Sequence, residues 1–369
     1  MINVFEPTIN QNDIDLVVKE LRKKNISGTS IIVSKFEEKF KEIVGKKYCT
    51  GVSNGSVALD LALQSLNLKK DDEVILPSFT IISCLSAILR TGAKPVFCDV
   101  DLYSWNMTYE NVISKYTNKT KAVIMVHTYG LTAEAQEIKN FCNKNEIILI
   151  EDSSESHGQI YNNKNCGSFG DISIFSFYAN KHITMGEGGA LLTDSFSLNN
   201  IFKRMRNLDF STRKRFYHEE SYWNYRLGGL QAALGLSQIN NLQNMINMKI
   251  KQGTIYSKLL SDYSEHLQIP LSENLGVKNH YWVYGVIFKN NKLRNNVAKA
   301  LLEKQIETRP FFWPLHKQPL LKSKYFENVK LENTEKISKR GLYIPMGSHL
   351  TKKTQEYIIE NLLTVANLL

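Results

Sequence analysis

The chain has 369 residues, of which 43% are hydrophobic and 22% are charged. These proportions predict a folded globular protein with apolar material for one large and one smaller domain, and they exclude a chain that is disordered throughout. No apolar run reaches the ~18 residues of a membrane span, and the first residues lack the pattern of a signal peptide. We therefore expect a cytoplasmic protein that does not associate with membranes.

The formal net charge of +10 has two interpretations. Nucleic-acid binding concentrates cations on one segment or face, whereas the lysines here are scattered in doublets along the chain. Solubility and attraction of a small anionic substrate fit this distribution better than a nucleic-acid partner does. The five cysteines are widely spaced and contain no Cys-x-x-Cys pair, which predicts buried thiols and no metal site.

Hydrophobic periodicity predicts two amphipathic helices, over residues 11–24 and 34–44, followed by alternating strands and helices. Apolar runs predict strands over residues 48–53, 73–76, 95–100, 121–127, 147–150, 171–177 and 189–193. Near-continuous apolar strands separated by helices indicate an α/β fold with a mostly parallel sheet covered on both faces. A long helix over residues 241–264 then leads to a smaller domain, so we expect domains at 1–245 and 246–369.

The stretch from Phe175 to Gly189 combines a buried strand with a lysine and a glycine-rich turn. The strand delivers Ser176 and then Lys181 to its carboxyl end, where α/β proteins place ligands and chemistry. A lone lysine after a strand is by default a solvated surface residue. A desolvated amine in such a crevice, however, can form a Schiff base with an aldehyde.

Two further strand ends carry candidate groups. Asp152 follows the strand at 147–150 and would project into the same crevice as Lys181 if their strands are close in the sheet. The turn containing Gly55 and Ser56 joins a strand to a helix capped by Asn54 or Ser56, and its free amides suit a phosphate. Either feature alone also fits an ordinary turn, so their combination with Lys181 carries the prediction of a site.

Six segments resemble, in order and spacing, the pyridoxal-phosphate sugar aminotransferases of the DegT/DnrJ/EryC1/StrS family. They are residues 53–59, 77–80, 126–130, 151–152, 175–189 and 224–227. Within the family the sequence is most similar to GDP-perosamine synthases, notably through Glu307-Thr308-Arg309-Pro310-Phe311-Phe312. The resemblance covers nearly the whole chain. It implies the aspartate aminotransferase fold (fold type I) and a homodimer whose active sites are shared across the interface.

The resemblance also implies pyridoxal 5'-phosphate as the cofactor and gives roles to the matching residues. Lys181 would bind the cofactor covalently and, once released, move a proton between cofactor and substrate carbon. Asp152 would keep the pyridine nitrogen protonated, so that the ring accepts electrons from the substrate. The phosphate would be bound by the backbone amides of Gly55 and Ser56, the hydroxyl of Ser176, and Asn224 of the partner subunit.

Two positions depart from the family pattern. The residue after Thr80 is often aromatic and stacks on the cofactor ring, whereas Ile81 here offers only aliphatic contact. The third residue after the cofactor aspartate is frequently Gln or His, whereas this chain has Glu155. An ionised carboxylate would repel the cofactor's phenolate, so we expect Glu155 to be protonated or bridged by water.

The implied reaction moves an amino group from glutamate to the 4-keto group of a nucleotide-linked 4-keto-6-deoxy sugar. GDP-4-keto-6-deoxymannose giving GDP-perosamine is the expected pair, in the biosynthesis of a surface polysaccharide such as the O-antigen of lipopolysaccharide. Arg309 and His218 are candidates for the diphosphate, and Tyr217 and His316 for the sugar end. Arg309 fits a surface ion pair equally well.

Other functions remain open at this stage. The amino acceptor could be another keto sugar or a small keto-phosphate. Relatives with histidine in place of the lysine are sugar dehydratases, but this chain has Lys181 followed by His182. A non-catalytic regulator or a nucleic-acid-binding protein on this fold would not need Lys181, Asp152 and Ser176 together, so the sequence favours an enzyme.

Overall fold

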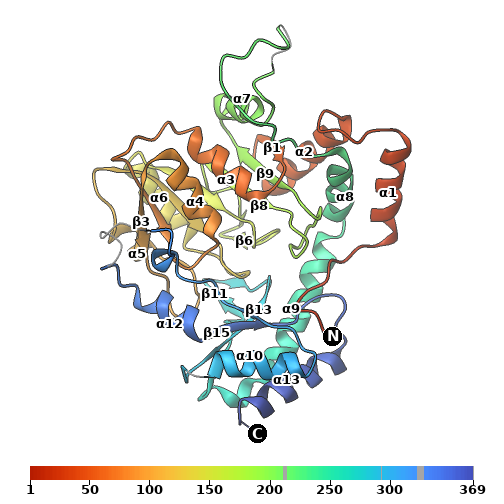
Figure 1. The fold of residues 1–369 in the computed structure, drawn as a ribbon, viewed down its shortest axis with the longest axis vertical. Helices are drawn as coiled ribbons and strands as arrows, with labels where there is room; N and C mark the ends of the chain where they lie inside the picture. Colours follow the sequence, from red (N-terminus) through yellow and green to blue (C-terminus); the bar gives the residue numbers. More distant parts are fainter. Residues whose placement is uncertain (211–213, 292, 322–327, 369) are drawn as a thin grey trace.

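The computed structural model describes residues 1–210, 214–291, 293–321 and 328–368 (Figure 1). It contains a large sheet in the upper half of the view and a smaller sheet in the lower half, with helix α9 (Leu242–Leu259) passing from one to the other. The amino terminus lies beside the lower sheet, where Ile2 forms a backbone bridge with Ile306.

The large sheet has seven strands in the order β1-β9-β8-β5-β4-β2-β3. Their bounds are β1 (Tyr48–Val52), β2 (Glu73–Pro77), β3 (Lys94–Cys98), β4 (Thr120–Val126), β5 (Ile148–Asp152), β8 (Ile172–Ser176) and β9 (Gly189–Thr193). Strand β9 is antiparallel to both of its neighbours, and the pairs from β8 to β3 are parallel. The expected mostly parallel sheet is therefore confirmed.

Helices cover both faces of this sheet, because the strands are apolar on both sides. One face carries α3 (Gly55–Gln64), α4 (Ile82–Thr91) and α7 (Phe196–Met205), and the other carries α2 (Ile31–Val44) and α6 (Ala135–Lys144). Alternate strand residues serve the two faces. Ile150 and Ile174 pack toward α3 and α4, whereas Leu149 and Phe175 pack into the clusters on the opposite face.

Helix α8 (Gly229–Ile239) packs between α1 (Gln11–Arg22) and α2, and the short α5 (Tyr109–Ile113) packs on α6. The start of α3 settles the question of its cap, since Asn54 Oδ1 accepts a hydrogen bond from the Val57 amide at 2.9 Å. The helix expected over residues 241–264 ends earlier, at Leu259, and a short 3₁₀ turn over Ser261–Tyr263 follows it.

The small sheet is antiparallel, with the order β10-β13-β15-β14. These strands are β10 (Leu267–Gln268), β13 (Tyr284–Phe288), β14 (Arg309–Pro310) and β15 (Gly341–Ile344). Helix α10 (Leu293–Glu303) lies between β13 and β14 in the chain, α12 (Glu332–Arg340) between β14 and β15, and α13 (Lys352–Val365) follows β15. Two hairpins pair β6 (Ile160–Tyr161) with β7 (Lys164–Asn165) and β11 (Glu273–Asn274) with β12 (Val277–Lys278). The domain boundary at residue 245 stays a prediction, and α9 is continuous across it.

An aromatic cluster joins the two sheets. Phe79, Trp105 and Tyr129 come from the large sheet's loops, whereas Trp282 precedes β13 and Phe311 follows β14 of the small sheet. Ring centroids within it lie 5.1 Å apart for Tyr129 and Phe311 and 5.7 Å apart for Tyr129 and Trp282. The cluster fixes the small sheet against the carboxyl ends of the parallel strands.

The five cysteines are all buried and unpaired, as the sequence predicts. Burial raises the pKa of the Cys98 and Cys142 thiols to about 12, which keeps them protonated. Among the described residues, no helix combines the length and the apolar character that crossing a lipid bilayer requires.

Candidate active site

A cavity of about 490 Å³ opens at the carboxyl ends of β5 and β8, against the aromatic cluster. It brings together residues at the ends of five strands of the large sheet (β1, β2, β4, β5 and β8) and residues from the smaller domain. The described lining residues are Asn54, Gly55, Ser56, Leu59, Thr80, Ile81, Ser83, Val126, Asp152, Ser154, Glu155, Ser176, Tyr178, Asn180, Lys181, Glu187, Trp282, Phe312 and Tyr343. Lys181 and Asp152 thus share one cavity, as their positions at neighbouring strand ends predict.

The Lys181 amine is enclosed rather than solvated. Its side chain is only 9% exposed, and Nζ lies 3.7 Å from Glu155 Oε1 and 3.9 Å from the centroid of the Trp282 ring. Burial lowers the pKa of Lys181, although the charges of Glu155 and Asp152 oppose the shift. An amine of this kind reaches its neutral, nucleophilic form at a lower pH than a surface lysine does.

Glu155 faces Lys181 from the loop after β5. Its Oε2 accepts a hydrogen bond from the Tyr129 amide at 3.0 Å, and Tyr129 adopts a left-handed backbone conformation, with a φ of 61°. Burial raises the pKa of Glu155 to about 7, against the lowering effect of Lys181. The carboxyl group is therefore partly protonated at neutral pH, in keeping with the expectation for a glutamate at this position.

Asp152 ends β5 on the face that α3 and α4 cover. It is 3% exposed, its Oδ1 accepts a hydrogen bond from the Ser154 amide at 3.1 Å, and its Oδ2 lies 3.7 Å from the Cys84 thiol. A thiol is a weak donor, so much of the accepting capacity of this carboxylate remains available on the cavity side. Such a group can hold a protonated ring nitrogen.

The opposite end of the cavity is formed by the first turn of α3. Gly55 starts the helix, and a Cβ atom there would lie 2.8 Å from Ser176 Cβ, so a side chain would fill the space between the turn and β8. Ser56 Oγ lies 2.6 Å from Ser83 Oγ, which adds hydroxyl groups at the same end. Free amides and hydroxyls at a helix amino terminus suit a phosphate group.

These positions fit pyridoxal phosphate. The α3 turn and Ser176 would hold its phosphate, Asp152 its ring nitrogen, and Lys181 its aldehyde carbon. Ile81 also lines the cavity and is 44% exposed, so it would cover the cofactor ring with aliphatic atoms only.

The candidate substrate residues do not line this cavity in the part of the chain that the structure describes. Arg309 pairs with Glu307 at 3.4 Å and lies over the Phe5 ring. His316 is buried, with Nδ1 2.6 Å from Ser78 Oγ and Nε2 3.1 Å from Glu335 Oε1. Their substrate roles stay predictions.

Three further candidates lie on the segment that follows α7. Tyr217 and His218 lie between α7 and α8 in the chain, and Tyr217 is exposed. His218 Nδ1 lies 2.6 Å from the backbone oxygen of Leu208. Asn224 forms a backbone bridge with Asn207, outside the cavity of its own chain.

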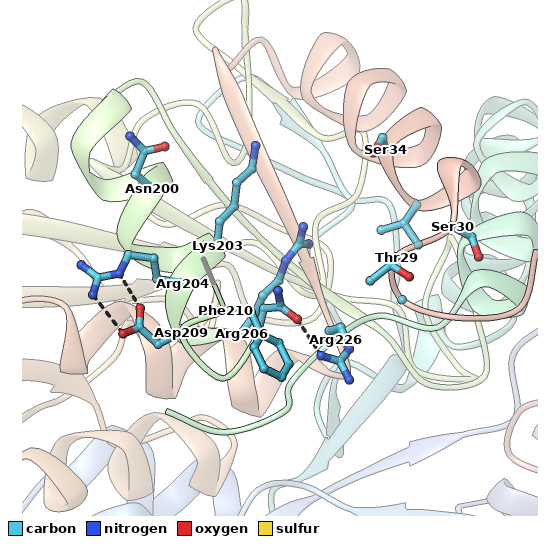
Figure 2. Close-up of a pocket in the computed structure, with 13 residues that line it drawn as sticks. Thr29, Ser30, Ser34, Asn200, Lys203, Arg204, Arg206, Asp209, Phe210 and Arg226 are labelled. Carbon is cyan, nitrogen blue, oxygen red and sulfur yellow. Dashed lines mark hydrogen bonds and ion pairs between the residues drawn. The ribbon is translucent and has the colours of Figure 1, made fainter. Parts of the chain in front are cut away.

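A second cavity, of about 690 Å³, lies between α7 and the start of α2 (Figure 2). It is strongly basic, with Lys203, Arg204, Arg206 and Arg226 in its lining. Arg204 binds Asp209 through two hydrogen bonds, Arg226 Nη1 donates to Asn207 Oδ1 at 2.6 Å, and Arg206 pairs with Glu37. The cavity lies where the segment carrying Asn224 leaves α7.

Trp282 is the main lining residue that the sequence analysis did not single out. The apolar run predicts a strand over residues 281–288, so the aromatic residues between His280 and Tyr284 look like core residues of that strand. In the structure β13 begins only at Tyr284, and Tyr281 has a left-handed backbone with a φ of 48°. This break turns Trp282 toward Lys181, and the density of aromatic residues before the strand is the one signal of it.

The chain is similar to known proteins over nearly its whole length. The chain is 34% identical to the GDP-perosamine synthase of Escherichia coli O157:H7 over 98% of this chain and 97% of that protein. It is 33% identical to the GDP-perosamine synthase of Vibrio cholerae, with 94% of each chain covered. The crystal structure of the aminotransferase TlmJ from Streptoalloteichus hindustanus superposes with a TM-score of 0.92 at 26% identity, over 100% of this chain and 99% of that one.

The fold and the site define a pyridoxal-phosphate-dependent aminotransferase of fold type I. Residues 7–363 match the model of a single family over almost the whole length of the chain. The chain belongs to the DegT/DnrJ/EryC1/StrS aminotransferase family.

Proposed function

We propose that this enzyme transfers the amino group of glutamate to the 4-keto group of GDP-4-keto-6-deoxymannose and so produces GDP-perosamine. The observation that carries the proposal is the cavity that joins Lys181, Asp152 and the α3 turn. The choice of sugar is supported by the similarity to GDP-perosamine synthases over nearly the whole chain. We further propose that the reaction takes place in the cytoplasm and supplies a surface polysaccharide such as O-antigen.

Each residue of the cavity has a defined task in this proposal. When bound, pyridoxal phosphate supplies an electron sink for the substrate carbon. Lys181 Nζ holds the cofactor and, once free, moves the proton at that carbon. Asp152 holds the proton of the ring nitrogen, and the Gly55 and Ser56 amides bind the phosphate. Trp282, Phe312 and Tyr343 line the cavity on the side of the smaller domain and would limit the access of water.

The substrate proposal is tested with a panel of nucleotide-linked keto sugars and glutamate as the donor. Mass spectrometry should show a 4-amino-4,6-dideoxy sugar nucleotide and 2-oxoglutarate, with GDP-4-keto-6-deoxymannose consumed fastest. Faster amination of another keto sugar or of a small keto-phosphate would move the proposal to that substrate. Dehydration in place of amination would contradict it, and the presence of Lys181 speaks against that outcome.

We also propose a homodimer with shared active sites. Asn224, Tyr217 and His218 lie away from the cavity of their own chain, on the segment after α7 that adjoins the basic cavity. A second copy would bring this segment to the site, with Asn224 at the cofactor phosphate and His218 and Arg309 at the substrate diphosphate.

Mixed dimers test the shared site. Asn224→Ala should weaken cofactor retention, and Lys181→Ala should abolish transamination. Mixing the two variants should restore activity, because one of the two sites in a mixed dimer would carry both native residues. Failure of folded mixed dimers to regain activity would contradict the proposal that Asn224 serves the partner's site.

A further inference from the structure

The Lys181 amine contacts two groups of different chemistry. On one side, 3.7 Å away, is the carboxyl group of Glu155, and on the other, 3.9 Å from the ring centroid, is the indole face of Trp282. The titratable groups that act on this amine are Glu155 and Asp152, and Lys181 in turn acts on His157. Trp282 is the contact that carries no charge and comes from the small sheet's side of the cavity.

Trp282 is held in place by three interactions. Its indole Nε1 donates to the backbone oxygen of Asn180 at 3.1 Å, directly before Lys181 in the chain. Its backbone oxygen accepts a hydrogen bond from the Nζ of the buried Lys249 on α9 at 3.0 Å. Its ring packs against Tyr129 with 5.7 Å between the centroids. The ring therefore has little freedom to turn away from the amine.

Tyr129 links the two sides of the enclosure. Its amide donates to Glu155 Oε2 at 3.0 Å, and its ring supports Trp282. The carboxyl group and the indole face are thus fixed by one residue and keep their spacing about the amine.

We propose that Trp282 is a positioning residue for Lys181: its indole face orients the amine toward the cavity and stabilises the protonated amine. An aromatic face attracts an ammonium group within about 6 Å of its centroid and has no comparable attraction for a neutral amine. The face accordingly opposes the effect of burial on Lys181. It also differs from Glu155, because a ring face holds the charge without accepting the proton.

The different effects of the Trp282 ring and the Glu155 carboxyl group on the amine suit the role proposed for Lys181. An amine that moves a proton at the substrate carbon has to hold that proton briefly and then release it. A carboxylate as the sole partner would compete for the proton, whereas the indole face keeps the ammonium group in position. The inference rests on the proposed function only for the proton transfer at the substrate carbon, since the contact between the Lys181 amine and the Trp282 ring exists in the free protein.

The test measures the pKa of the Lys181 amine in the full chain freed of cofactor. The rate of acylation of Lys181 by acetic anhydride is followed by peptide mass spectrometry across neutral and alkaline pH. Trp282→Leu should lower the pKa of Lys181 by about 0.5 to 1 unit, the range that follows from the usual strength of such contacts. Trp282→Phe should give a smaller shift in the same direction, because phenyl is the weaker face.

Trp105→Phe is the matched control. Trp105 belongs to the same aromatic cluster, with its ring 6.1 Å from Tyr129 and 5.2 Å from Phe311, but it does not line the cavity. The same loss of an indole there should leave the pKa of Lys181 unchanged. Circular dichroism and thermal unfolding show whether each variant is folded, and if Trp282→Leu does not fold, Trp282→Phe decides.

A second readout uses the enzyme loaded with cofactor. If Trp282 positions the amine, Trp282→Phe should lower kcat more than it raises KM, since the amine acts in the chemical step. An unchanged pKa of Lys181 in a folded Trp282 variant would overturn the inference. If no keto sugar is aminated at all, the proposed function fails, while the pKa measurement still decides the role of Trp282.

Discussion

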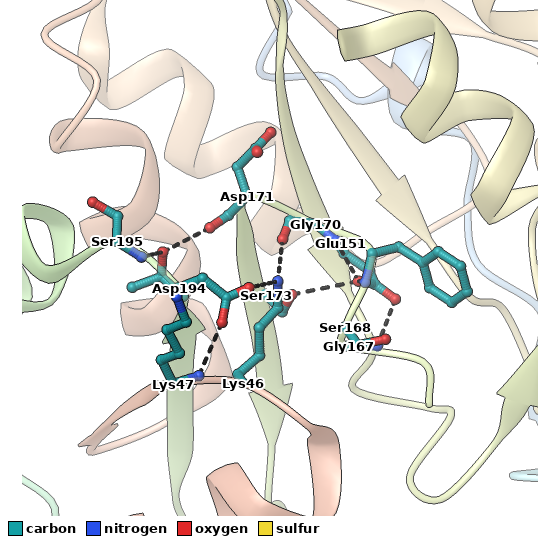
Figure 3. Close-up of polar contacts among 12 residues, drawn as sticks. Lys46, Lys47, Glu151, Gly167, Ser168, Gly170, Asp171, Ser173, Asp194 and Ser195 are labelled. Carbon is teal, nitrogen blue, oxygen red and sulfur yellow. Dashed lines mark hydrogen bonds and ion pairs between the residues drawn. The ribbon is translucent and has the colours of Figure 1, made fainter. Parts of the chain in front are cut away.

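Glu151 and Asp152 are consecutive carboxylates at the end of β5, both buried, and they point to opposite faces of the sheet. Glu151 accepts hydrogen bonds from the amides of Gly167, Phe169 and Gly170 and lies 2.9 Å from His127 Nε2. Figure 3 shows Glu151 beside the loop that contains Gly167 and Gly170. Although burial raises its pKa, the contact with His127 and these amides hold the pKa of Glu151 below its usual value.

Asp152 has far fewer internal partners. It accepts a hydrogen bond from the Ser154 amide and faces the Cys84 thiol, and the remainder of the carboxylate faces the cavity. Residue type, burial and position in the strand are nearly the same for the two acids. The difference is the number of donors that the protein itself supplies, so an acid with unused accepting capacity marks the place of a ligand.

Of the two acids, Asp152 should have by far the larger effect on transamination when it is changed to Asn. Without the carboxylate the ring nitrogen loses the charge that keeps it protonated, so transamination should fall by about 10²- to 10³-fold, as for the loss of one preorganised electrostatic group. Steady-state kinetics on cofactor-saturated enzyme measures this, with urea unfolding as the check on the fold. Near-normal kcat in the variant would remove Asp152 from the mechanism.

Glu151→Gln should act on stability. The side-chain amide would place donor hydrogens against backbone amides that now donate to Glu151, and His127 would lose its acceptor. Removing one partner of a buried charged network costs about 3–5 kcal/mol. Urea unfolding should show this loss, whereas kcat per folded molecule should change little; the opposite pattern would contradict the comparison.

Acid should destabilise the protein through its buried histidines. Burial lowers the pKa of His157 to about 3 and that of His280 to about 4, and it also lowers that of His182. Below pH ~6.5 the unfolded chain binds protons that the folded chain does not, so stability falls as the pH falls. The loss is about 2 kcal/mol at pH ~5 for each of His157 and His280. Unfolding at several pH values should show His157→Gln to be less sensitive to acid by about that amount.

Glu155→Gln should give the smallest of these effects. The carboxyl group raises the pKa of Lys181 by its charge, so the amide should lower that pKa by about 1 unit. The variant and the native chain should differ in the charge acting on Lys181 only above about pH 7, where Glu155 is ionised. Acylation of Lys181 followed by mass spectrometry measures the shift, and a rise in pKa would contradict the assignment.

The sequence predicts those parts of the site that can be recognised from a short stretch of the chain. The apolar strands, the lysine after β8, the acid ending β5 and the turn before α3 can each be recognised within a few residues, and parallel strand order brings them together. Trp282 could not be placed in this way, because its contact with Lys181 depends on how the small sheet packs about one hundred residues further along the chain. The contact of the buried His316 with Ser78 likewise joins residues that are 238 positions apart in the sequence.

The most direct test of the central claim is to locate the covalent attachment of pyridoxal phosphate. Cofactor-loaded protein is reduced with borohydride and digested, and the peptides are analysed by mass spectrometry. The account predicts a phosphopyridoxyl group on Lys181 and none on the Lys181→Ala variant. Attachment at a different lysine, or a protein that does not take up the cofactor, would contradict it.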